Sequence, residues 1–448
     1  MSYFTEQIYG FCQEYGNMEL PLKLEEIASD LFADSMGCMK AGLYESSARS
    51  ITKYLSAKKR TDVEEPERLL EKLDAEEKAL FYGFVSHNFD FDNSSNIIGH
   101  NSAVLFPALL ALSGETAVSG RDFISAYLLG TEVSFKVASF MIPGMNFRGF
   151  HITPVFGVIG AAAACAWLLK LGEAEFVNAV SIAVSQCSGL MAQFGSMMKF
   201  CHCGLAASGA LRAVKMALAG VTGKPDVLEG KSGFFQAYYQ PAHATDMSLG
   251  KPWSMLRESF LIKAYPCCSA SHSAIYGMQS FLRETGTDPR EIKSVKVLVP
   301  KYTTNNLIYS RPRNETEAKF SMNFAVANVM KNFDYDFGAF ARENIESPEL
   351  RDYMERIEMT VTDKYPDFVE AEPCVLKIET GRGTYEKEIP FGLGRTLDSP
   401  LSREQLLKKF TMCTRGRFAS PEDTFDKMHA VASVSRIRFN IFKGDIQY

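Results

Sequence analysis

The sequence predicts a mostly α protein, and two observations carry that prediction. Apolar residues recur at helical spacing from the first residue to about residue 264, whereas alternating apolar residues, which are typical of strands, are confined to residues 265–400. Helical spacing returns in residues 401–448, and we expect this tail to pack back onto the first region. The length of 448 residues exceeds what one hydrophobic core usually supports, so two or three packed units are expected.

The first region is predicted to form long helices rich in Ala, Gly and Ser, such as the stretch GAAAACAWLL. Small side chains let helix axes approach closely, so this region should be a tightly packed helical body. The expected helices span residues 21–56, 101–116, 120–141, 153–171, 173–190 and 203–219.

The second region mixes strands and helices and is predicted to be a smaller α+β unit. Alternation appears in SVKVLVP and RIEMTVTD, and two further strands flank Gly381-Arg382-Gly383, which predicts a hairpin. In the tail, Ser402 and Gln405 form a capping-box pattern that opens a helix, and helical character extends to about residue 434. The expected strands are 295–299, 357–361, 375–380 and 385–389, and the expected helices are 269–286, 320–332 and 347–356.

Composition excludes several classes of protein. Hydrophobic residues make up 46% and charged residues 23%, which argues against a largely disordered chain. The net charge of −5 and the lack of a long Lys/Arg block argue against a nucleic-acid-binding face. The uncharged stretch from Ile152 to Leu169 is too weakly apolar for a membrane span, and the N-terminus lacks the features of a secretory signal. Ten Cys without an export signal indicate reduced thiols and a cytoplasmic protein.

The first candidate for chemistry is the segment from Asp90 to His100, which reads DFDNSSNIIGH. Carboxylates separated by one residue and followed by short polar side chains can simply form a structural Asx turn. A calcium loop would need Gly and Glu where Ser95 and Asn101 stand, so calcium is excluded. The functional interpretation is hydrogen bonding or proton transfer by Asp90, Ser94 and His100.

The second candidate is the segment from Arg148 to Pro154, RGFHITP. Thr153 is a good N-cap and Pro154 a good first helical residue, so a helix should begin there. His151 and Arg148 would then stand beside free backbone N–H groups at the positive end of a helix dipole, a natural place for a carboxylate. Arg148 fits equally well as a solvated loop residue.

The third candidate surrounds Lys199 in GSMMKFCHCG. A lysine between two Met and a Phe is partly desolvated, which favours its neutral form and suits it to proton abstraction or to pairing with an anion. The structural alternative is a snorkelling lysine on an apolar surface. Ser196 is a candidate substrate-binding hydroxyl, and the Cys201-His202-Cys203 spacing does not match a zinc knuckle.

The fourth candidate is KAYPCCSASH, which ends at His272. A cysteine nucleophile would need a glycine-rich elbow or an oxyanion turn, which this segment lacks, so His272 is favoured as an acid/base or binding group over Cys267 and Cys268. The sequence also has no Walker loop and no dinucleotide fingerprint, so no nucleotide cofactor is expected. No metal is expected either, because the spacings of Cys201-His202-Cys203 and Cys267-Cys268 do not match those of zinc ligands.

Taken together and in this order, the four segments resemble the MmgE/PrpD family, which contains 2-methylcitrate dehydratases, cis-aconitate decarboxylases and iminodisuccinate epimerase. The similarity runs over nearly the whole chain. It rests on DFDNS…GHNSAVLFPALLAL, RGFHIT, GSMMKFCHCGLAASG, LEGKSGFF, KAYPCC…SH, FSMNFAVANVM and DSPLS. The chain departs from the family pattern at Asn93-Ser94, where Asp-Thr is common, at Asn101, where Pro is common, and at Met198, where Thr is common.

The resemblance implies a large all-helical domain with an inserted smaller α+β domain. On this view residues 1–264 form the helical domain, residues 265–400 form a lid, and residues 401–448 add C-terminal helices to the helical domain. It also implies a homodimer and a cofactor-free site between the domains for small di- or tricarboxylic acids. By motif matching, the pocket residues are Asp90, Ser94, His100, His151, Lys199 and His272, with His202 as a weaker addition.

The implied activity is that of a lyase working at the carbon beside a carboxylate. Negative charge gathers on that carboxylate in the transition state, so Lys199 with His151 is expected to hold or polarise it. One of His151, Lys199 and His272 should act as base and another as acid, with Asp90 orienting a histidine. Elimination of water is favoured, decarboxylation of a cis-aconitate-like acid comes second and epimerisation third. A non-catalytic carboxylate-binding scaffold is the rival from another class.

Overall fold

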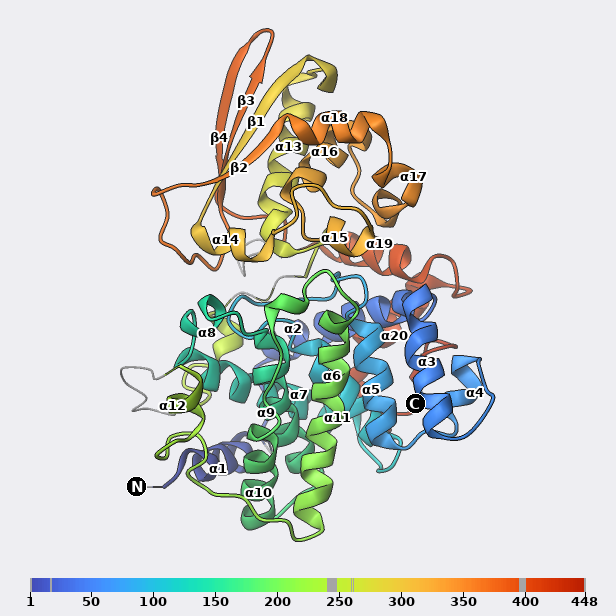
Figure 1. The fold of residues 1–448 in the computed structure, drawn as a ribbon. Coiled ribbons are helices and arrows are strands. Elements are labelled where there is room, and N and C mark those ends of the chain that lie inside the picture. The colour runs from blue at the N-terminus through green and yellow to red at the C-terminus, as the bar shows by residue number, and fades with distance from the viewer. Residues whose placement is uncertain are drawn as a thin grey trace. The chain divides into compact units, whose positions relative to one another are not determined.

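A computed structural model describes residues 2–16, 18–239, 248–258, 260, 262–394 and 400–446. Helices account for 57% of the chain and strands for 8%, so the prediction of a mostly α fold is confirmed. The chain divides into two compact units (Figure 1). The larger unit contains Met1–Leu190, Phe200–Glu258 and Ser402–Tyr448, and the smaller unit contains Met191–Lys199 and Ser259–Leu401.

The larger unit is built from helices, with one short two-stranded sheet near the C-terminus that the sequence did not predict. Its helices before the smaller unit are α1 (Phe4–Gly16), α2 (Leu22–Gly42), α3 (Ser46–Lys58), α4 (Pro66–Leu70), α5 (Ala75–Ser86), α6 (Ser102–Ser113), α7 (Gly120–Ser139), α8 (Gly144–Phe147), α9 (Ile152–Leu168), α10 (Glu173–Val184), α11 (Met198–Leu218, whose first two residues cluster with the smaller unit) and α12 (Phe234–Tyr238). After it come α19 (Arg403–Thr414), α20 (Pro421–His429), β5 (Phe439–Asn440) and β6 (Asp445–Ile446).

The centre of the larger unit depends on small residues, as the Ala- and Gly-rich pattern predicted. A Cβ atom on Gly160 of α9 would lie 2.3 Å from the carbonyl oxygen of Gly130 on α7, and one on Gly130 would lie 2.5 Å from that of Gly160. Only glycine permits such a close crossing. The apolar stretch that begins at Ile152 is therefore the buried helix α9, and no described helix has the length and apolar character to cross a membrane.

Most helix boundaries lie within three residues of the prediction, and three differ by more, one of which is the end of α10 at Val184, six residues before the expected residue 190. The segment 21–56 was expected to be one helix, but it breaks after Gly42, where a Cβ atom would lie 1.9 Å from the carbonyl oxygen of Val85 on α5. Helix α11 begins at Met198, five residues before the expected start. Periodicity could not show either feature, because both depend on what packs against the chain.

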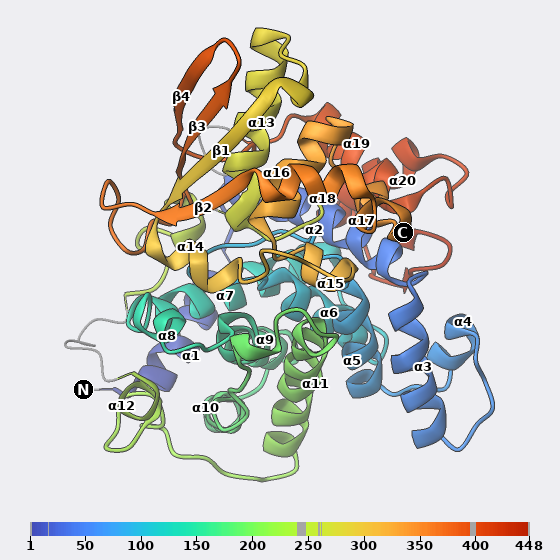
Figure 2. The same ribbon diagram turned by 45° about the horizontal axis from the view of Figure 1, so that its top comes forward.

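The C-terminal helices belong to the larger unit, where α19 and α20 both contact α2 (Figure 2). The predicted capping box is confirmed: Ser402 Oγ accepts a hydrogen bond from Gln405 N, and Gln405 Oε1 accepts one from Ser402 N. Beyond residue 434 the chain forms the short β5–β6 pair.

The smaller unit contains a four-stranded sheet in the order β2-β1-β3-β4. Strand β1 runs parallel to β2 and antiparallel to β3, and the predicted β3–β4 hairpin is confirmed, with Thr380 paired to Gly383 across a two-residue loop. Helix α13 contacts β3, and α16 contacts β2. The elements are α13 (His272–Thr285), β1 (Ile292–Val299), α14 (Lys301–Asn306), α15 (Glu315–Ala318), α16 (Met322–Asn332), α17 (Arg342–Ile345), α18 (Pro348–Glu355), β2 (Ile357–Val361), β3 (Cys374–Thr380) and β4 (Gly383–Ile389).

Candidate functional site

The loop between α5 and α6 gathers two histidines and two carboxylates in the larger unit. His87 lies at the C-terminal end of α5, and His100 lies two residues before α6. Asp90 and Asp92 lie between them, and all four side chains are buried. Residues Ser95 and Gly99 pair with each other across a short bridge, which folds the loop back on itself.

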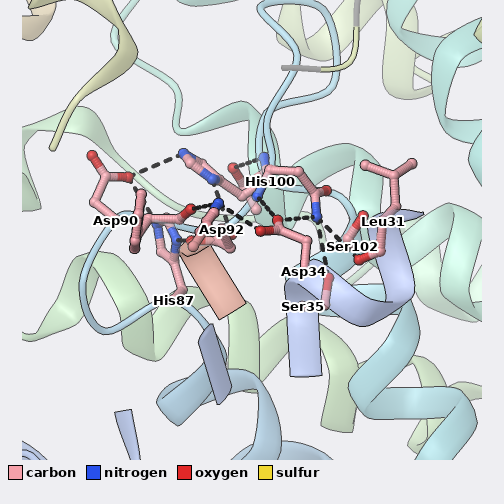
Figure 3. Close-up of polar contacts among 12 residues, drawn as sticks. Leu31, Asp34, Ser35, His87, Asp90, Asp92, His100 and Ser102 are labelled. Atoms are coloured by element: carbon pink, nitrogen blue, oxygen red, sulfur yellow. Dashed lines mark hydrogen bonds and ion pairs between the residues drawn. The ribbon is translucent and has the colours of Figure 1, made fainter. Parts of the chain in front are cut away.

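These four side chains form a closed ring of polar contacts (Figure 3). The two carboxylate oxygens of Asp92 lie 2.8 Å from His87 Nδ1 and 3.0 Å from His100 Nδ1. Asp90 Oδ1 lies on the other side of the rings, 3.1 Å from His100 Nε2 and 3.9 Å from His87 Nε2. The structure therefore brings Asp90 and His100 together and adds His87 and Asp92, which the sequence interpretation did not select.

The charge on Asp92 is stabilised by its neighbours. Burial by itself would raise the pKa of this carboxyl, but electrostatic attraction to the His87 and His100 rings and their hydrogen bonds outweigh burial and hold the pKa well below its usual range. Asp92 is thus the fixed negative centre of the ring. Asp90, by contrast, adopts a left-handed backbone conformation with φ of 52°, which non-glycine residues adopt rarely and at functional positions more often than elsewhere.

A buried ion pair between Asp34 and Lys409 holds the loop between α5 and α6. Asp34 of α2 accepts hydrogen bonds from Asn93 N at 3.1 Å and from Asn93 Nδ2 at 3.0 Å. Lys409 of α19 lies 2.5 Å from Asp34 and donates a hydrogen bond to Phe91 O at 2.7 Å. Lys409 and Asp34 therefore fix the backbone on the two sides of Asp92, at Phe91 and at Asn93 respectively.

The start of α9 contacts the other end of the loop. His100 N donates a hydrogen bond to Thr153 Oγ1 at 3.0 Å. The prediction that Thr153 caps α9 is wrong: the helix begins at Ile152, and His151 occupies the N-cap position without a side-chain cap bond. A threonine hydroxyl can cap its own helix or accept a hydrogen bond from another segment, and periodicity does not show which segment lies nearby.

Gly99 allows this contact, and its replacement by alanine should destabilise the larger unit. Its φ is 64°, and a Cβ atom would lie 2.3 Å from Thr153 Oγ1. Gly149→Ala is the matched control, because its φ of 83° carries the same conformational cost but nothing lies within 4 Å. We expect Gly149→Ala to cost about 1 kcal/mol and Gly99→Ala clearly more, measured by thermal unfolding. Equal losses would mean that the contact with Thr153 is unimportant.

His151 and His202 form a second buried cluster in the larger unit. Their Nδ1 atoms lie 3.0 Å apart, and His151 N donates a hydrogen bond to Gly189 O at 3.1 Å. The ring of His151 also lies 6.3 Å from that of His87, measured between ring centroids. A hydrogen bond between two ring nitrogens requires one donor and one acceptor, so the pair shares a proton.

The other predicted residues of the larger unit have different environments. Ser94 is buried, and its hydroxyl has no hydrogen-bond partner among the described residues. Arg148 is exposed and donates a hydrogen bond to Tyr238 O at 2.8 Å. A buried hydroxyl without a partner suits a ligand contact, so Ser94 remains a strong candidate.

In the smaller unit, Lys199 is buried between two aromatic rings. Its ammonium nitrogen lies 5.1 Å from the centroid of Phe194 and 5.0 Å from that of Phe320. Such faces attract a cation, which suits Lys199 to pairing with an anion rather than to proton abstraction. Ser196 is partly exposed, and its hydroxyl donates to Gln193 O at 2.8 Å.

His272 is the first residue of α13 and is buried in the smaller unit. Its Nε2 lies 3.4 Å from Cys267 O, and the ring packs against Tyr265. Cys268 N donates to Lys319 O, so the chain before His272 lies beside the segment whose next residue, Phe320, packs on Lys199. The described cysteines are all free thiols.

Within the described part of the chain, one group of side chains could hold a metal ion. Ligand atoms of His87, Asp92 and His100 lie within 4.8 Å of one another, and two histidines with a carboxylate suit zinc. The same atoms, however, already make direct contacts of hydrogen-bond length within the ring. The absence of a metal therefore stays a prediction.

The sequence alone contains only part of the information needed to predict this ring of four polar side chains. His87 and His100 bracket an Asp-x-Asp sequence, which marks the segment as unusual. Spacing alone does not tell which carboxylate faces the Nδ1 atoms, because both Asp90 and Asp92 lie in irregular backbone. Asp90 was predicted to orient a histidine, and its Oδ1 lies 3.1 Å from His100 Nε2, whereas the carboxylate that contacts the Nδ1 atoms of both rings is that of Asp92.

Comparison with known proteins agrees with this architecture. The chain matches the MmgE/PrpD N-terminal domain over residues 6–246 and the MmgE/PrpD C-terminal domain over residues 265–433. It is 25% identical over 345 residues to the cis-aconitate decarboxylase of Mus musculus, which covers 74% of this chain and 70% of that protein. Identity to the enzyme of Homo sapiens is 26% over 347 residues, or 74% and 71% of the two chains.

A third relative is the cis-aconitate decarboxylase of Aspergillus terreus, 24% identical over 343 residues, which are 69% of this chain and 68% of that protein. These three relatives are decarboxylases and therefore lyases, which supports the prediction that this chain is an enzyme of the same family. Because the two domain matches together span most of the sequence, the chain belongs to the MmgE/PrpD family.

Proposed function

We propose that this protein is a cofactor-independent lyase that decarboxylates a small unsaturated tricarboxylic acid of the cis-aconitate type. The sequence alone ranked dehydration first, and the names of the relatives favour decarboxylation instead. The structural observation that carries the proposal is the His151–His202 pair, because a buried imidazole with a shared proton is a suitable proton donor.

The reaction needs an anion site and a proton donor. In a cis-aconitate-like acid, the bond between a methylene carbon and its carboxylate breaks and CO₂ leaves. The electron pair forms a new double bond, and the former double bond shifts its electrons to the carbon beside another carboxylate. That carbon then takes up a proton, which gives a methylene-substituted dicarboxylic acid. Charge on the second carboxylate is stabilised by a cation, and the proton comes from a general acid.

The residues of this chain can be given roles in that sequence. Lys199 holds the carboxylate on which charge develops, since its aromatic neighbours favour a cation. His151 delivers the proton, and Ser94 offers its hydroxyl to the substrate. His272 and the Asp90–His100 pair supply the remaining acid/base groups, and Arg148, Ser196 and His202 remain candidates for substrate binding.

Dehydration of a 2-methylcitrate-like acid is the second candidate. It needs a base for the proton beside the carboxylate and an acid for the departing hydroxyl group. The larger unit contains two separate imidazole pairs, His151–His202 and His87–His100, which is enough for both roles. Epimerisation of an iminodisuccinate-like acid would use one such pair.

Proton NMR in D₂O tests these alternatives. Purified protein is mixed separately with cis-aconitate, 2-methylcitrate and iminodisuccinate. We expect cis-aconitate to lose CO₂ and to give a product with one deuterium on the methylene carbon beside a carboxylate. Water loss from 2-methylcitrate would instead show the dehydratase, and exchange at the α-carbon of iminodisuccinate the epimerase. A rise in melting temperature without turnover of any acid would favour a binding protein and contradict the proposal.

We further propose a cytoplasmic homodimer that binds neither nucleic acid nor membrane. The proposal rests on the family and on the net charge of −5. Light scattering coupled to size-exclusion chromatography tests the oligomeric state, since a chain of 49.9 kDa would then elute with twice that mass.

A further inference from the structure

We propose that Asp92 is a positioning residue that fixes the protonation of two imidazoles at once, so that His87 and His100 both present Nε2 to Asp90. This inference deepens the proposed function and rests on it. Within the polar ring, Asp92 orients the two imidazoles, and Asp90 with His100 exchanges a proton with a bound molecule.

The Nδ1 atoms of both rings lie beside Asp92. An ionised carboxylate only accepts hydrogen bonds. One oxygen of Asp92 lies 2.8 Å from His87 Nδ1, and the other lies 3.0 Å from His100 Nδ1. Both Nδ1 atoms must therefore carry hydrogen, and a single side chain determines the tautomer of two rings.

The Nε2 atoms of both rings lie on the side of Asp90. A neutral imidazole that carries hydrogen on Nδ1 has a lone pair on Nε2. His100 Nε2 lies 3.1 Å from Asp90 Oδ1, and two acceptors at that distance need a hydrogen between them. One proton is thus held between Asp90 and His100, either on the carboxyl or on the imidazole. Asp92 holds no such proton.

The two histidines and Asp92 differ in how far their side chains are exposed. The side chain of His100 is 11% exposed, whereas those of His87 and Asp92 are 0% and 1% exposed. Only His100 among the three reaches the surface of the unit, so it is the ring that can meet a substrate. Asp92 acts through His100 and has no accessible atom with which to bind one.

Contacts with the neighbouring backbone keep Asp92 in place. The residues on either side of it are both tied to the helical body, because Lys409 holds Phe91 O and Asp34 holds Asn93 N. This rigidity is what a positioning residue needs, since a displaced carboxylate would release both tautomers.

The substitution Asp92→Asn gives a sharp test. An asparagine side chain has one accepting oxygen and one donating nitrogen. The oxygen can serve one ring as before, but the nitrogen must donate to the Nδ1 of the other, which therefore has to carry its hydrogen on Nε2. One ring of the two should change tautomer. Asp90→Asn is the contrasting variant, because it leaves Asp92 and both Nδ1 hydrogens in place.

The readout is a long-range ¹H–¹⁵N correlation spectrum of the full-length protein labelled at its histidines, with His87→Gln used to assign the two rings. We expect hydrogen on both Nδ1 atoms in the wild type and in Asp90→Asn, and hydrogen moved to Nε2 in one ring of Asp92→Asn. Turnover of Asp92→Asn should fall at least ~10²-fold in kcat with little change in KM, because Asp92 does not touch the substrate.

The tautomers are observable whether or not the protein turns over any acid, so failure of the proposed function and failure of this inference are distinguishable. A wild-type spectrum in which either Nδ1 lacks hydrogen would overturn the inference, and it needs no variant to fold. So would unchanged tautomers in Asp92→Asn, or stoichiometric zinc in the purified protein by elemental analysis, since zinc would replace hydrogen at the ring nitrogens.

Discussion

Replacing His151 by alanine should lower turnover at least ~10²-fold while the protein stays folded, because a general acid typically contributes 10²–10⁴-fold. The imidazole is buried and shares a proton with His202 across 3.0 Å. The backbone N–H of His151, which donates to Gly189 O, is retained in the alanine variant, so the start of α9 should be preserved. Steady-state kinetics on the acid identified by NMR, together with circular dichroism, checks this result.

Lys199→Ala should give a loss of the same size, through loss of the cation that holds the carboxylate. Each variant has a matched control in this chain. His429→Ala removes a histidine that pairs with Asp30, and Lys215→Ala removes a partly exposed lysine, paired with Glu115, from α11, the helix that also carries Lys199. Both controls should keep turnover close to the wild-type value. Near-normal turnover in both His151→Ala and Lys199→Ala would contradict the assignment.

Replacing Lys409 by methionine should cost about 3–5 kcal/mol, because it leaves the buried Asp34 without its charged partner. Burial by itself lowers the pKa of Lys409, but the charge and hydrogen bond of Asp34 raise it above its ordinary value, so the lysine is an ammonium. The methionine variant also removes the hydrogen bond to Phe91 O. We expect a lower melting temperature and faster amide hydrogen exchange in residues 87–100.

Lys408→Met is the control, because this neighbouring side chain is exposed and should change stability by less than about 0.5 kcal/mol. Adding Asp34→Leu to Lys409→Met should restore part of the loss, since removing both partners of a buried pair is milder than removing one. The recovery should be incomplete because Asn93 would lose the two hydrogen bonds that it donates to Asp34. Equal stability of Lys408→Met and Lys409→Met would show that the buried pair does not hold the loop.

Local patterns predicted the elements that depend on local interactions. The Ser402–Gln405 capping box is present because its two hydrogen bonds join residues three apart. The β3–β4 hairpin is present because its strands are neighbours in the sequence and Gly383, with φ of 133°, adopts a backbone conformation that favours glycine beside the turn. The break after Gly42 was missed because the cause lies in α5, more than 40 residues further along the chain.

The same distinction applies to the candidate site. Four short segments with unusual residues could be recognised from the sequence, and they pointed to Asp90, His100, His151, Lys199 and His272. Thr153 was taken for a helix cap, yet its hydroxyl accepts a hydrogen bond from His100 N, 53 positions away. A polar side chain has several acceptable partners, and only the packed chain determines which one it meets.

The sequence by itself determined the helical and mixed regions, the family resemblance and the segments that carry chemistry, because periodicity, turns and motifs are properties of neighbouring residues. The tertiary structure alone decided that Asp92 bridges two imidazoles, that His151 pairs with His202 and that Lys409 fixes the loop that carries Asp92. Each of these depends on distances between side chains brought together by folding, where one residue along a loop changes which ring nitrogen a carboxylate faces.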